Sequence, residues 1–208
     1  MKIIIADDHF IVRKGLINII KETYSFAKIT EAPDATELVK HLMKSSFDIV
    51  ITDLSMPGQS GIEIVKQIKE IAPQTPLLVL STYPPEQFAV RAIKSGASGY
   101  LNKESSFSEL VNAIDTLLNS KKYITPEVAT LLADAYSGDI KGKEHESLSD
   151  REFEVLKLIS QGKTVTEVAE YLSLSTNTIS TYRARILEKL NLHSTTDIIK
   201  YALEKGIA

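Results

Sequence analysis

The chain of 208 residues contains no cysteine. This absence excludes disulfide scaffolds, zinc sites built from thiolates, and cysteine nucleophiles. No apolar run approaches the roughly 20 residues that a membrane-spanning helix needs. The first apolar run, residues 3–6, stops at Asp7 and is too short for the core of a signal peptide. We therefore expect a cytoplasmic protein with no membrane partner.

The sequence also lacks a segment with an excess of positive charge, and its formal net charge is −3. Residues 148–208 hold eight basic and eight acidic residues. If this segment binds nucleic acid, it must do so through a local patch and through dimerisation, because affinity depends on the cations at the contact itself. The hydrophobic content of 43% and the charged content of 25% are ordinary for a globular protein.

Short apolar runs alternate with helical periodicity over the first 120 residues. The apolar runs predict strands at residues 2–6, 27–31, 48–52, 76–81 and 98–101. Amphipathic patterns predict a helix after each strand, at residues 10–22, 34–44, 61–71, 85–95 and 106–119. Five such pairs predict a doubly wound α/β domain with a parallel sheet, because parallel strands need crossover connections.

A boundary follows this domain. Thr125 and Pro126 are typical of a helix start, and the helix is predicted to reach Tyr136. Residues 137–147 are polar and contain two glycines, which indicates a flexible linker. If disordered, they would span roughly 17–20 Å.

From Leu148 onward the patterns are helical only. Helices are predicted at residues 150–161, 165–172, 176–190 and 195–205, with a three-residue turn at 173–175. Two helices joined by such a short turn form a helix-turn-helix. The chain therefore divides into residues 1–122, a linker helix and flexible linker at 123–147, and a small all-α domain of four helices at 148–208.

Polar residues stand where the predicted strands end. Asp7 and Asp8 follow the first strand, Asp53 the third and Lys103 the fifth, while Ser81 ends the fourth. The carboxyl ends of parallel strands share one edge of the sheet, so we expect these residues to converge. Converging carboxylates repel one another unless a cation compensates, and hard oxygen ligands suit Mg²⁺.

Such a pocket has the parts needed for phosphoryl transfer. A carboxylate such as Asp53 can attack as nucleophile, while the Lys103 ammonium holds a phosphoryl oxygen and the Ser81 hydroxyl follows the new oxygens. Taken singly, each residue is more often an ordinary strand end, turn cap or solvated charge. The prediction rests on their joint placement.

Three motifs carry a family resemblance: Asp7-Asp8-His9, Asp53-Leu54-Ser55-Met56-Pro57-Gly58 and Tyr100-Leu101-Asn102-Lys103. They resemble the receiver domain of two-component response regulators, over residues 1 to about 120. The resemblance implies a flavodoxin-like (βα)5 fold and a sensor histidine kinase that phosphorylates Asp53. It also implies that Asp8, Asp53 and the Ser55 carbonyl ligate Mg²⁺ with Asp7 supporting, and that Ser81 and Tyr100 switch rotamers.

One position departs from the family pattern. Glu104 follows Lys103 where the family usually has proline, so the usual reason for a cis peptide bond there is missing. Tyr100, taken without the resemblance, could equally be an ordinary half-buried aromatic residue. The four histidines show no ligand spacing and are expected to be neither catalytic nor metal-binding, although His9 lies beside the pocket. Gly58 and Gly61 fit a loop and a helix start, not a nucleotide fingerprint.

The helix predicted at residues 176–190 has one apolar and one polar face. Ile179, Ile186, Leu187 and Leu190 recur at helical spacing and should face the core. A recognition helix reads bases from its N-terminal part and contacts phosphates with basic side chains. The candidate DNA contacts are therefore Asn177, Thr178, Ser180, Thr181, Tyr182, Arg183, Arg185 and Lys189. An ordinary solvated face remains the alternative.

Residues 148–156, 167–169 and 175–190 resemble the LuxR-type domain of the NarL/FixJ family of regulators. Many members carry lysine and histidine where this chain has Ser180 and Tyr182, so base contacts of lysine-bearing relatives do not transfer to Ser180. Apolar residues of the last helix predict a dimer contact, with core packing as the alternative: Ile198, Ile199, Tyr201 and Ala202.

Together these features predict a transcription regulator that accepts a phosphoryl group on Asp53 and then changes its dimerisation and its binding to double-stranded DNA. It is not expected to be an enzyme beyond its own phosphorylation and dephosphorylation. A constitutive DNA-binding dimer is one alternative. An aspartate-nucleophile phosphohydrolase is another, but it needs a second acid two residues after the nucleophile, where this chain has Ser55.

Overall fold

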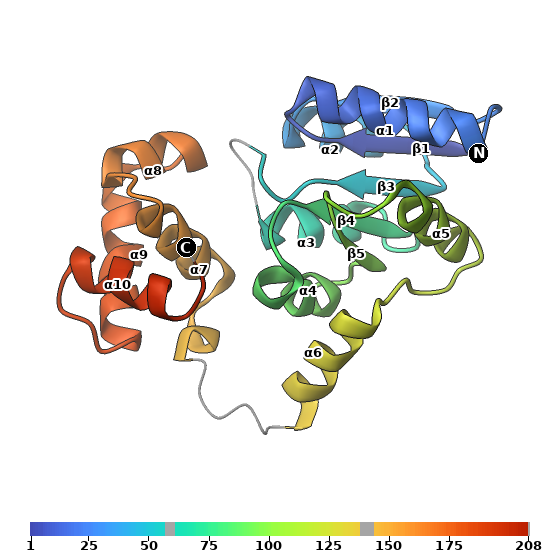
Figure 1. Cartoon of the computed structure of the whole chain (residues 1–208). Coiled ribbons are helices and arrows are strands. Elements are labelled where there is room, and N and C mark those ends of the chain that lie inside the picture. The colour runs from blue at the N-terminus through green and yellow to red at the C-terminus, as the bar shows by residue number, and fades with distance from the viewer. Residues whose placement is uncertain (57–60, 138–143, 208) are drawn as a thin grey trace. The chain divides into compact units, whose positions relative to one another are not determined.

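The computed structural model describes residues 1–56, 61–137 and 144–207 (Figure 1). The chain forms two compact units, Met1–Tyr136 and Ser137–Ala208. Within the described ranges, no helix is both long enough and apolar enough to cross a membrane. Pro57 and Gly58 of the aspartate motif and most of the predicted flexible linker lie outside these ranges.

The first unit is built on a five-stranded parallel sheet with the strand order β2-β1-β3-β4-β5. Its strands are β1 (Lys2–Ala6), β2 (Lys28–Ala32), β3 (Ile49–Thr52), β4 (Leu77–Ser81) and β5 (Gly99–Asn102). The two central strands β3 and β4 are buried along their whole length, as expected where helices cover both faces of a parallel sheet. The predicted doubly wound fold is confirmed, and the strand ends lie within one residue of those predicted.

Five helices cover the sheet: α1 (Phe10–Thr23), α2 (Ala35–Lys44), α3 (Ile62–Ile71), α4 (Pro85–Lys94) and α5 (Phe107–Leu118). Helices α1 and α5 share one face, where Leu16, Ile20 and Ile114 pack with Ile3 and Ile5 in a single apolar cluster. On the other face α2 contacts α3, and α3 contacts α4. This arrangement leaves the carboxyl ends of the strands open at one edge.

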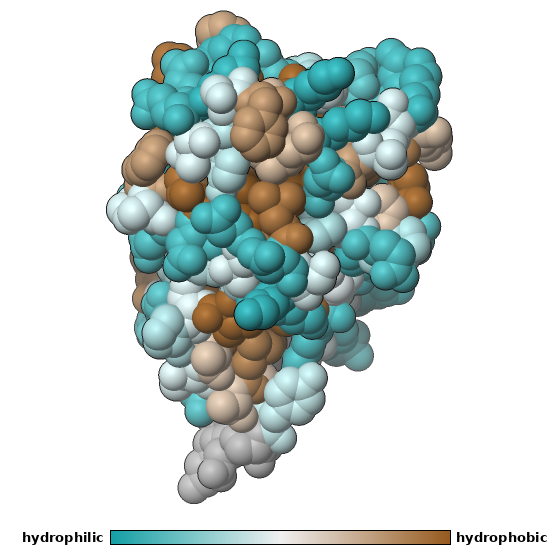
Figure 2. Space-filling view, turned by 90° about the vertical axis from the view of Figure 1, so that its right-hand side faces the viewer, coloured by the Kyte–Doolittle hydropathy of each residue, from teal (hydrophilic) through white to brown (hydrophobic). Residues whose placement is uncertain are grey.

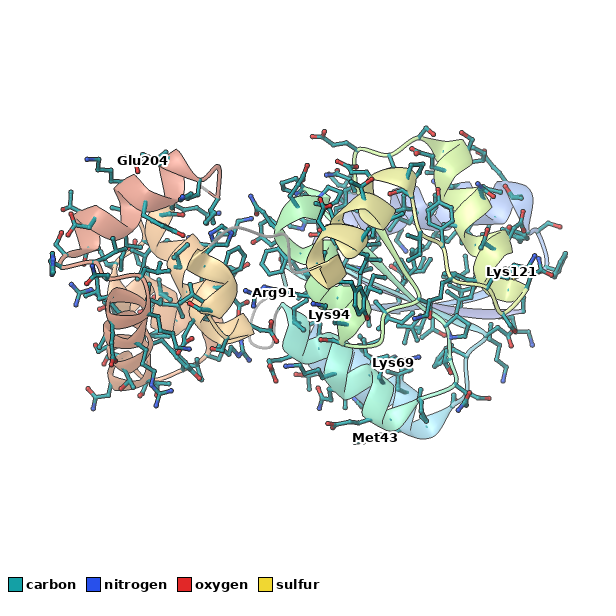
Figure 3. The ribbon with its side chains drawn as sticks, turned by 90° about the horizontal axis from the view of Figure 1, so that it is seen from below. Met43, Lys69, Arg91, Lys94, Lys121 and Glu204 are labelled. Atoms are coloured by element: carbon teal, nitrogen blue, oxygen red, sulfur yellow. The ribbon has the colours of Figure 1, made fainter. Side chains whose placement is uncertain are left out.

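Helix α6 (Pro126–Ser137) is attached to the first unit. The Thr125 hydroxyl accepts a hydrogen bond from the Val128 amide at 3.3 Å, and the Val128 side chain is buried. The Lys94 ammonium of α4 lies 5.7 Å from the centre of the Tyr136 ring (Figure 3). The compact unit therefore extends beyond residue 122, where the patterns predicted the linker to begin.

The second unit contains a short 3-10 helix η1 (Glu144–Ser147) and four α-helices, α7 (Asp150–Ser160), α8 (Val165–Leu172), α9 (Thr176–Lys189) and α10 (Thr195–Glu204). Capping boxes start α7 at Ser149 and α8 at Thr164. Each hydroxyl accepts a hydrogen bond from the third helical amide, and the glutamate at that third position accepts one from the N-cap amide. Between α8 and α9, Ser173 adopts a left-handed conformation with φ 54°, which makes the turn tight. The predicted helix-turn-helix is confirmed.

Candidate functional site

The predicted acidic pocket forms at the carboxyl edge of the sheet. The Asp53 amide donates to the Ala6 carbonyl at 2.9 Å, which fixes Asp53 beside the end of β1. The Lys103 amide likewise donates to the Ser81 carbonyl at 2.8 Å. The strand register therefore brings together residues that are up to 96 positions apart between Asp7 and Lys103.

Lys103 bridges two carboxylates inside this pocket. Its Nζ lies 2.5 Å from Asp7 Oδ2 and 2.7 Å from Asp53 Oδ2, and only 9% of its side chain is exposed. Burial lowers the pKa of Lys103, but the two carboxylates raise it more, and its net shift is upward. The ammonium therefore stays charged and compensates the acidic pair.

Asp53 has one oxygen bound and one free. Lys103 donates to Oδ2, whereas the buried Oδ1 has no hydrogen-bond partner among the described residues. Burial raises the pKa of Asp53, with a smaller contribution from the charge of Asp7, whereas Lys103 and the backbone amide of Ser55 oppose this rise. A buried carboxylate oxygen without a donor is costly, and a cation or a new covalent bond would relieve that cost.

Four side chains can offer ligand atoms within 4.8 Å of one another: Asp7, Asp8, His9 and Asp53. Such a set can hold a divalent cation, and its carboxylate oxygens match the preference of Mg²⁺. The structure places His9 at the rim, with 63% of its side chain exposed and Nδ1 2.9 Å from Asp8 Oδ1. The free Oδ1 of Asp53 supports the fit between these residues and a metal ion.

Ser81 and Tyr100 lie beside the pocket and are both buried. The Tyr100 hydroxyl donates to the Tyr83 carbonyl at 2.7 Å, and the Tyr83 amide donates to Ser81 Oγ at 3.2 Å. Burial raises the pKa of the Tyr100 phenol, so it remains a neutral donor. These bonds connect the ends of β4 and β5 to the segment that leads into α4.

Arg13 supports the pocket from behind, and the sequence patterns gave no sign of it. The buried guanidinium donates from Nη1 to the Asp7 carbonyl at 2.6 Å, and its Nε lies 3.5 Å from Glu31 Oε2. A hydrogen bond from Lys14 is the largest of the effects that lower the pKa of Glu31. An isolated arginine in an amphipathic helix belongs to no motif, so only the tertiary contacts identify its role.

Two further expectations concern the backbone. The described residues contain no cis peptide bond, in agreement with the missing proline after Lys103. Gly61 has φ 64° and forms the N-cap of α3, which is the helix start expected there, while Gly58 lies outside the described residues. Leu54 and Met56 are fully buried, so they anchor the segment that follows Asp53.

Helix α9 presents the polar face that its sequence predicts. Its core side is formed by Ile179 and Ile186, and Leu190 is buried just beyond the helix end. The exposed candidates are Asn177, Ser180, Thr181, Arg185 and Lys189, and the half-buried ones are Thr178, Tyr182 and Arg183.

Two of the basic candidates have partners within the unit. Lys189 Nζ lies 2.7 Å from the buried Glu152 carboxylate of α7, and it also donates to the Ser147 carbonyl at 3.3 Å. Arg183 Nε donates to Thr195 Oγ1 at 2.8 Å. Lys189 is exposed, as predicted, and its ammonium also braces α9 against α7, because the buried Glu152 carboxylate needs a counter-charge.

Helix α10 uses most of its apolar stripe inside its own unit. Ile198, Tyr201 and Ala202 are buried, and His145 Nδ1 of η1 lies 3.1 Å from the Tyr201 hydroxyl oxygen. Three of the four predicted dimer residues therefore fill the core of the unit. Ile199 is half-buried, and Leu203, with 66% of its surface exposed, is the large accessible apolar residue of this helix.

Family comparisons agree with this geometry. Residues 3–115 match the response regulator receiver domain, and residues 146–202 match the bacterial regulatory proteins of the luxR family. The oxygen regulatory protein NreC of Staphylococcus carnosus is 35% identical over 100% of this chain and 99% of its own length. The response regulator UvrY of Escherichia coli K12 is 29% identical over 100% of this chain and 95% of its own.

Solved structures give the same result. RcsB of Salmonella enterica serovar Typhimurium, bound to the promoter rprA in the presence of phosphomimetic BeF3⁻, has a TM-score of 0.69 and 29% identity. That comparison covers 97% of this chain and 98% of the RcsB chain. A two-component response regulator RcsB–DNA complex gives a TM-score of 0.59 and 31% identity over 97% and 96% of the two chains. The chain belongs to the response regulators that join a receiver domain to a LuxR-type DNA-binding domain.

Proposed function

We propose that this protein is a cytoplasmic transcription regulator in which a sensor histidine kinase phosphorylates Asp53 and thereby changes dimerisation and promoter binding. The observation that carries the proposal is the asymmetry of Asp53: Oδ2 is held by Lys103, while the buried Oδ1 has no donor among the described residues. In functional terms residues 1–122 are the receiver, 123–147 the linker and 148–208 the DNA-binding domain.

The chemistry is an in-line phosphoryl transfer. A carboxylate oxygen of Asp53 attacks phosphorus, the bond between phosphorus and the histidine nitrogen of the kinase breaks with its electron pair left on that nitrogen, and an aspartyl phosphate forms. Lys103 is already oriented by two carboxylates and can hold a phosphoryl oxygen. Ser81 and Tyr100 are the proposed switch residues, since their contacts meet at Tyr83 ahead of α4.

A divalent cation fits the same pocket. We propose Mg²⁺, held by Asp8, Asp53 and the Ser55 carbonyl, with Asp7 in support. When bound, it would supply charge neutralisation for the transferred phosphoryl group. The role of Arg13 is to hold the Asp7 backbone in position by its bond to the Asp7 carbonyl.

Double-stranded DNA is the proposed target of α9. Asn177, Ser180 and Thr181 lie exposed toward its N-terminal part, where a recognition helix reads base edges. Arg185 is exposed further along and suits a phosphate. Thr178, Tyr182 and Arg183 are half-buried and would support the contact surface.

Dimerisation compensates for the lack of net positive charge in this unit, because a dimer doubles the number of phosphate contacts. We propose that α10 contributes Ile199 and Leu203 to the dimer, as these apolar side chains are the ones that its own core leaves accessible.

Phosphorylation is tested by incubating the full-length protein with acetyl phosphate and Mg²⁺ and weighing the intact chain. We expect one added phosphoryl group on the wild type, none on Asp53→Ala, and one on Asp48→Ala. Asp48 precedes the same strand and is exposed at the opposite edge, so it is the matched control. Phosphorylation that persists in Asp53→Ala would refute the assignment.

Two measurements separate the alternatives. Equal promoter affinity with and without phosphorylation would favour a constitutive DNA-binding dimer. Repeated turnover of a phosphoester substrate would favour a phosphohydrolase. We expect neither, because the pocket combines a nucleophilic carboxylate with a paired ammonium, and Ser55 stands where a hydrolase needs its second acid.

A further inference from the structure

A second pocket lies in the first unit, at the edge of the sheet opposite Asp53. It has a volume of about 500 Å³ and is lined by residues that precede β3, β4 and β5 and by the segment after α5. Figure 2 views the molecule from the side on which the strands begin, where apolar residues lie among hydrophilic ones. Three lysines line this pocket, which we call the lysine pocket: Lys69, Lys121 and Lys122.

Lys69, labelled in Figure 3, is held in place by two contacts. Its Nζ donates to the Thr75 carbonyl at 2.9 Å. Its aliphatic stem lies against Gly96, where an added Cβ would meet Lys69 Cγ at 3.0 Å. Gly96 also has φ 107°, a conformation that favours glycine. The absence of a side chain at Gly96 therefore leaves room for the aliphatic part of Lys69 in the pocket wall.

The segment that carries the other two lysines has a fixed backbone. Ser120 adopts φ 57°, and the Lys121 amide donates to the Thr116 carbonyl at 3.2 Å, which ends α5 in a tight turn. Two residues later the Tyr123 amide donates to the Ser98 carbonyl at 2.9 Å. Lys121 and Lys122 are thus pinned between α5 and β5.

The charge of the pocket is unbalanced. Its single acidic lining residue is Asp48, and one oxygen of Asp48 already accepts the Lys2 amide at 2.7 Å. Burial lowers the pKa of Lys69, and the nearby Lys122 lowers it further. An anion bound beside Lys69 would stabilise its charged form.

A simpler explanation exists for each lysine alone, because cations near helix C-termini interact favourably with the last carbonyls. It accounts for Lys69 at the end of α3 and for the pair after α5. The helix-end interaction does not account for the pocket that lies between these lysines. The pocket also has an apolar wall, whose accessible members are Pro73, Pro76 and Leu118.

We propose that the lysine pocket binds a small phosphorylated molecule of the nucleoside polyphosphate class, with its phosphates on the lysines and its base against the apolar wall. The volume lies in the range of small-molecule sites, roughly 300–1,000 Å³, and exceeds what a phosphate alone would fill. This site is separate from the acidic pocket and does not depend on its phosphorylation.

The test is a calorimetric titration of the full-length protein with ATP in EDTA, which removes metal-dependent binding at the acidic pocket. We expect binding that weakens at high salt and becomes about tenfold weaker or more in Lys69→Met and in Lys122→Met. Lys66→Met, on an exposed side chain of the same helix, should bind as the wild type does. Lys122 is exposed on a surface segment, so its substitution reports on binding even where Lys69→Met disturbs the fold.

Three outcomes would overturn the proposal. They are no binding of ATP at millimolar concentration, equal affinity of the wild type and both pocket variants, and equal affinity of ATP and inorganic triphosphate. The last result would show that the apolar wall does not contact a base. The proposal is supported if the wild type binds ATP more tightly than triphosphate and both lysine variants lose their affinity for ATP.

Discussion

Replacing Lys103 with methionine should strongly destabilise the receiver unit. The substitution keeps most of the side-chain volume but removes the ammonium that lies 2.5 Å from Asp7 Oδ2 and 2.7 Å from Asp53 Oδ2. Both carboxylates are buried and would face one another without a cation. Removing one partner of a buried ion pair costs about 3–5 kcal/mol. This is a large part of the roughly 5–15 kcal/mol that stabilises a typical domain.

The assay is differential scanning calorimetry of the full-length chain without divalent metal, in which the two units can unfold as separate transitions. For a unit of this size, the expected loss corresponds to a melting temperature about 10–15 °C lower. Lys66→Met is the matched control, because its exposed pair with Glu63 should contribute no more than about 0.5 kcal/mol. Adding Mg²⁺ should restore much of the loss in Lys103→Met, since a bound cation replaces the missing charge.

The repulsion between Asp7 and Asp53 also predicts the sign of a second substitution. In the Lys103→Met background, Asp7→Asn should raise the melting temperature, because it removes one of two repelling charges. In the wild type the same change removes a partner of Lys103 and should lower it. A loss below about 1 kcal/mol in Lys103→Met, or Asp7→Asn lowering stability in both backgrounds, would refute the electrostatic account.

Three further predictions concern the second unit. Arg185→Ala should weaken binding to all DNA sequences and reduce the salt dependence by about one phosphate contact, as measured by titration at several salt concentrations. Glu152→Gln should lower the free energy of unfolding near neutral pH. Burial raises the pKa of Glu152, but Lys189 and Ser149 lower it more, so this stabilisation is present above pH 4.5 and is lost as the pH falls below it. The variant and wild type should therefore converge in acid. Burial lowers the pKa of Lys157 to about 7, so the unfolded state binds its proton more tightly, and stability should rise between pH 7 and about pH 10 by up to about 1.4 kcal/mol per pH unit. Urea titrations of Lys157→Met, compared with the wild type, should lack this contribution.

Most of the secondary structure could be predicted because the determining signals are local. Hydrophobic periodicity, N-cap residues and strand runs lie within a few positions of one another, and the observed ends agree closely with those predicted. The acidic pocket could be predicted for a different reason. A parallel sheet brings all its carboxyl ends to one edge, so the order of elements already implies that Asp7, Asp53 and Lys103 meet.

Other features depend on contacts that no local pattern encodes. Arg13 reaches the Asp7 carbonyl only after α1 has packed on the sheet. Lys189 looks like a free cation in the sequence, yet it pairs with a glutamate 37 positions away. The apolar residues of α10 were compatible with core packing or with a dimer contact. Because α7 packs against α10, Ile198 and Ala202 are buried in the core of the unit.

The two-part architecture, the parallel sheet and the identity of the residues at its carboxyl edge can be inferred from the amino-acid sequence. These follow from periodicity and chain order, which are properties of neighbouring residues. Three features depend on the three-dimensional packing: which oxygen of Asp53 lacks a donor, which cations have a partner, and how far the first unit extends along α6. Those results depend on distances of a few ångströms between segments far apart in the chain, because ion pairs and buried hydrogen bonds are made or lost over that range.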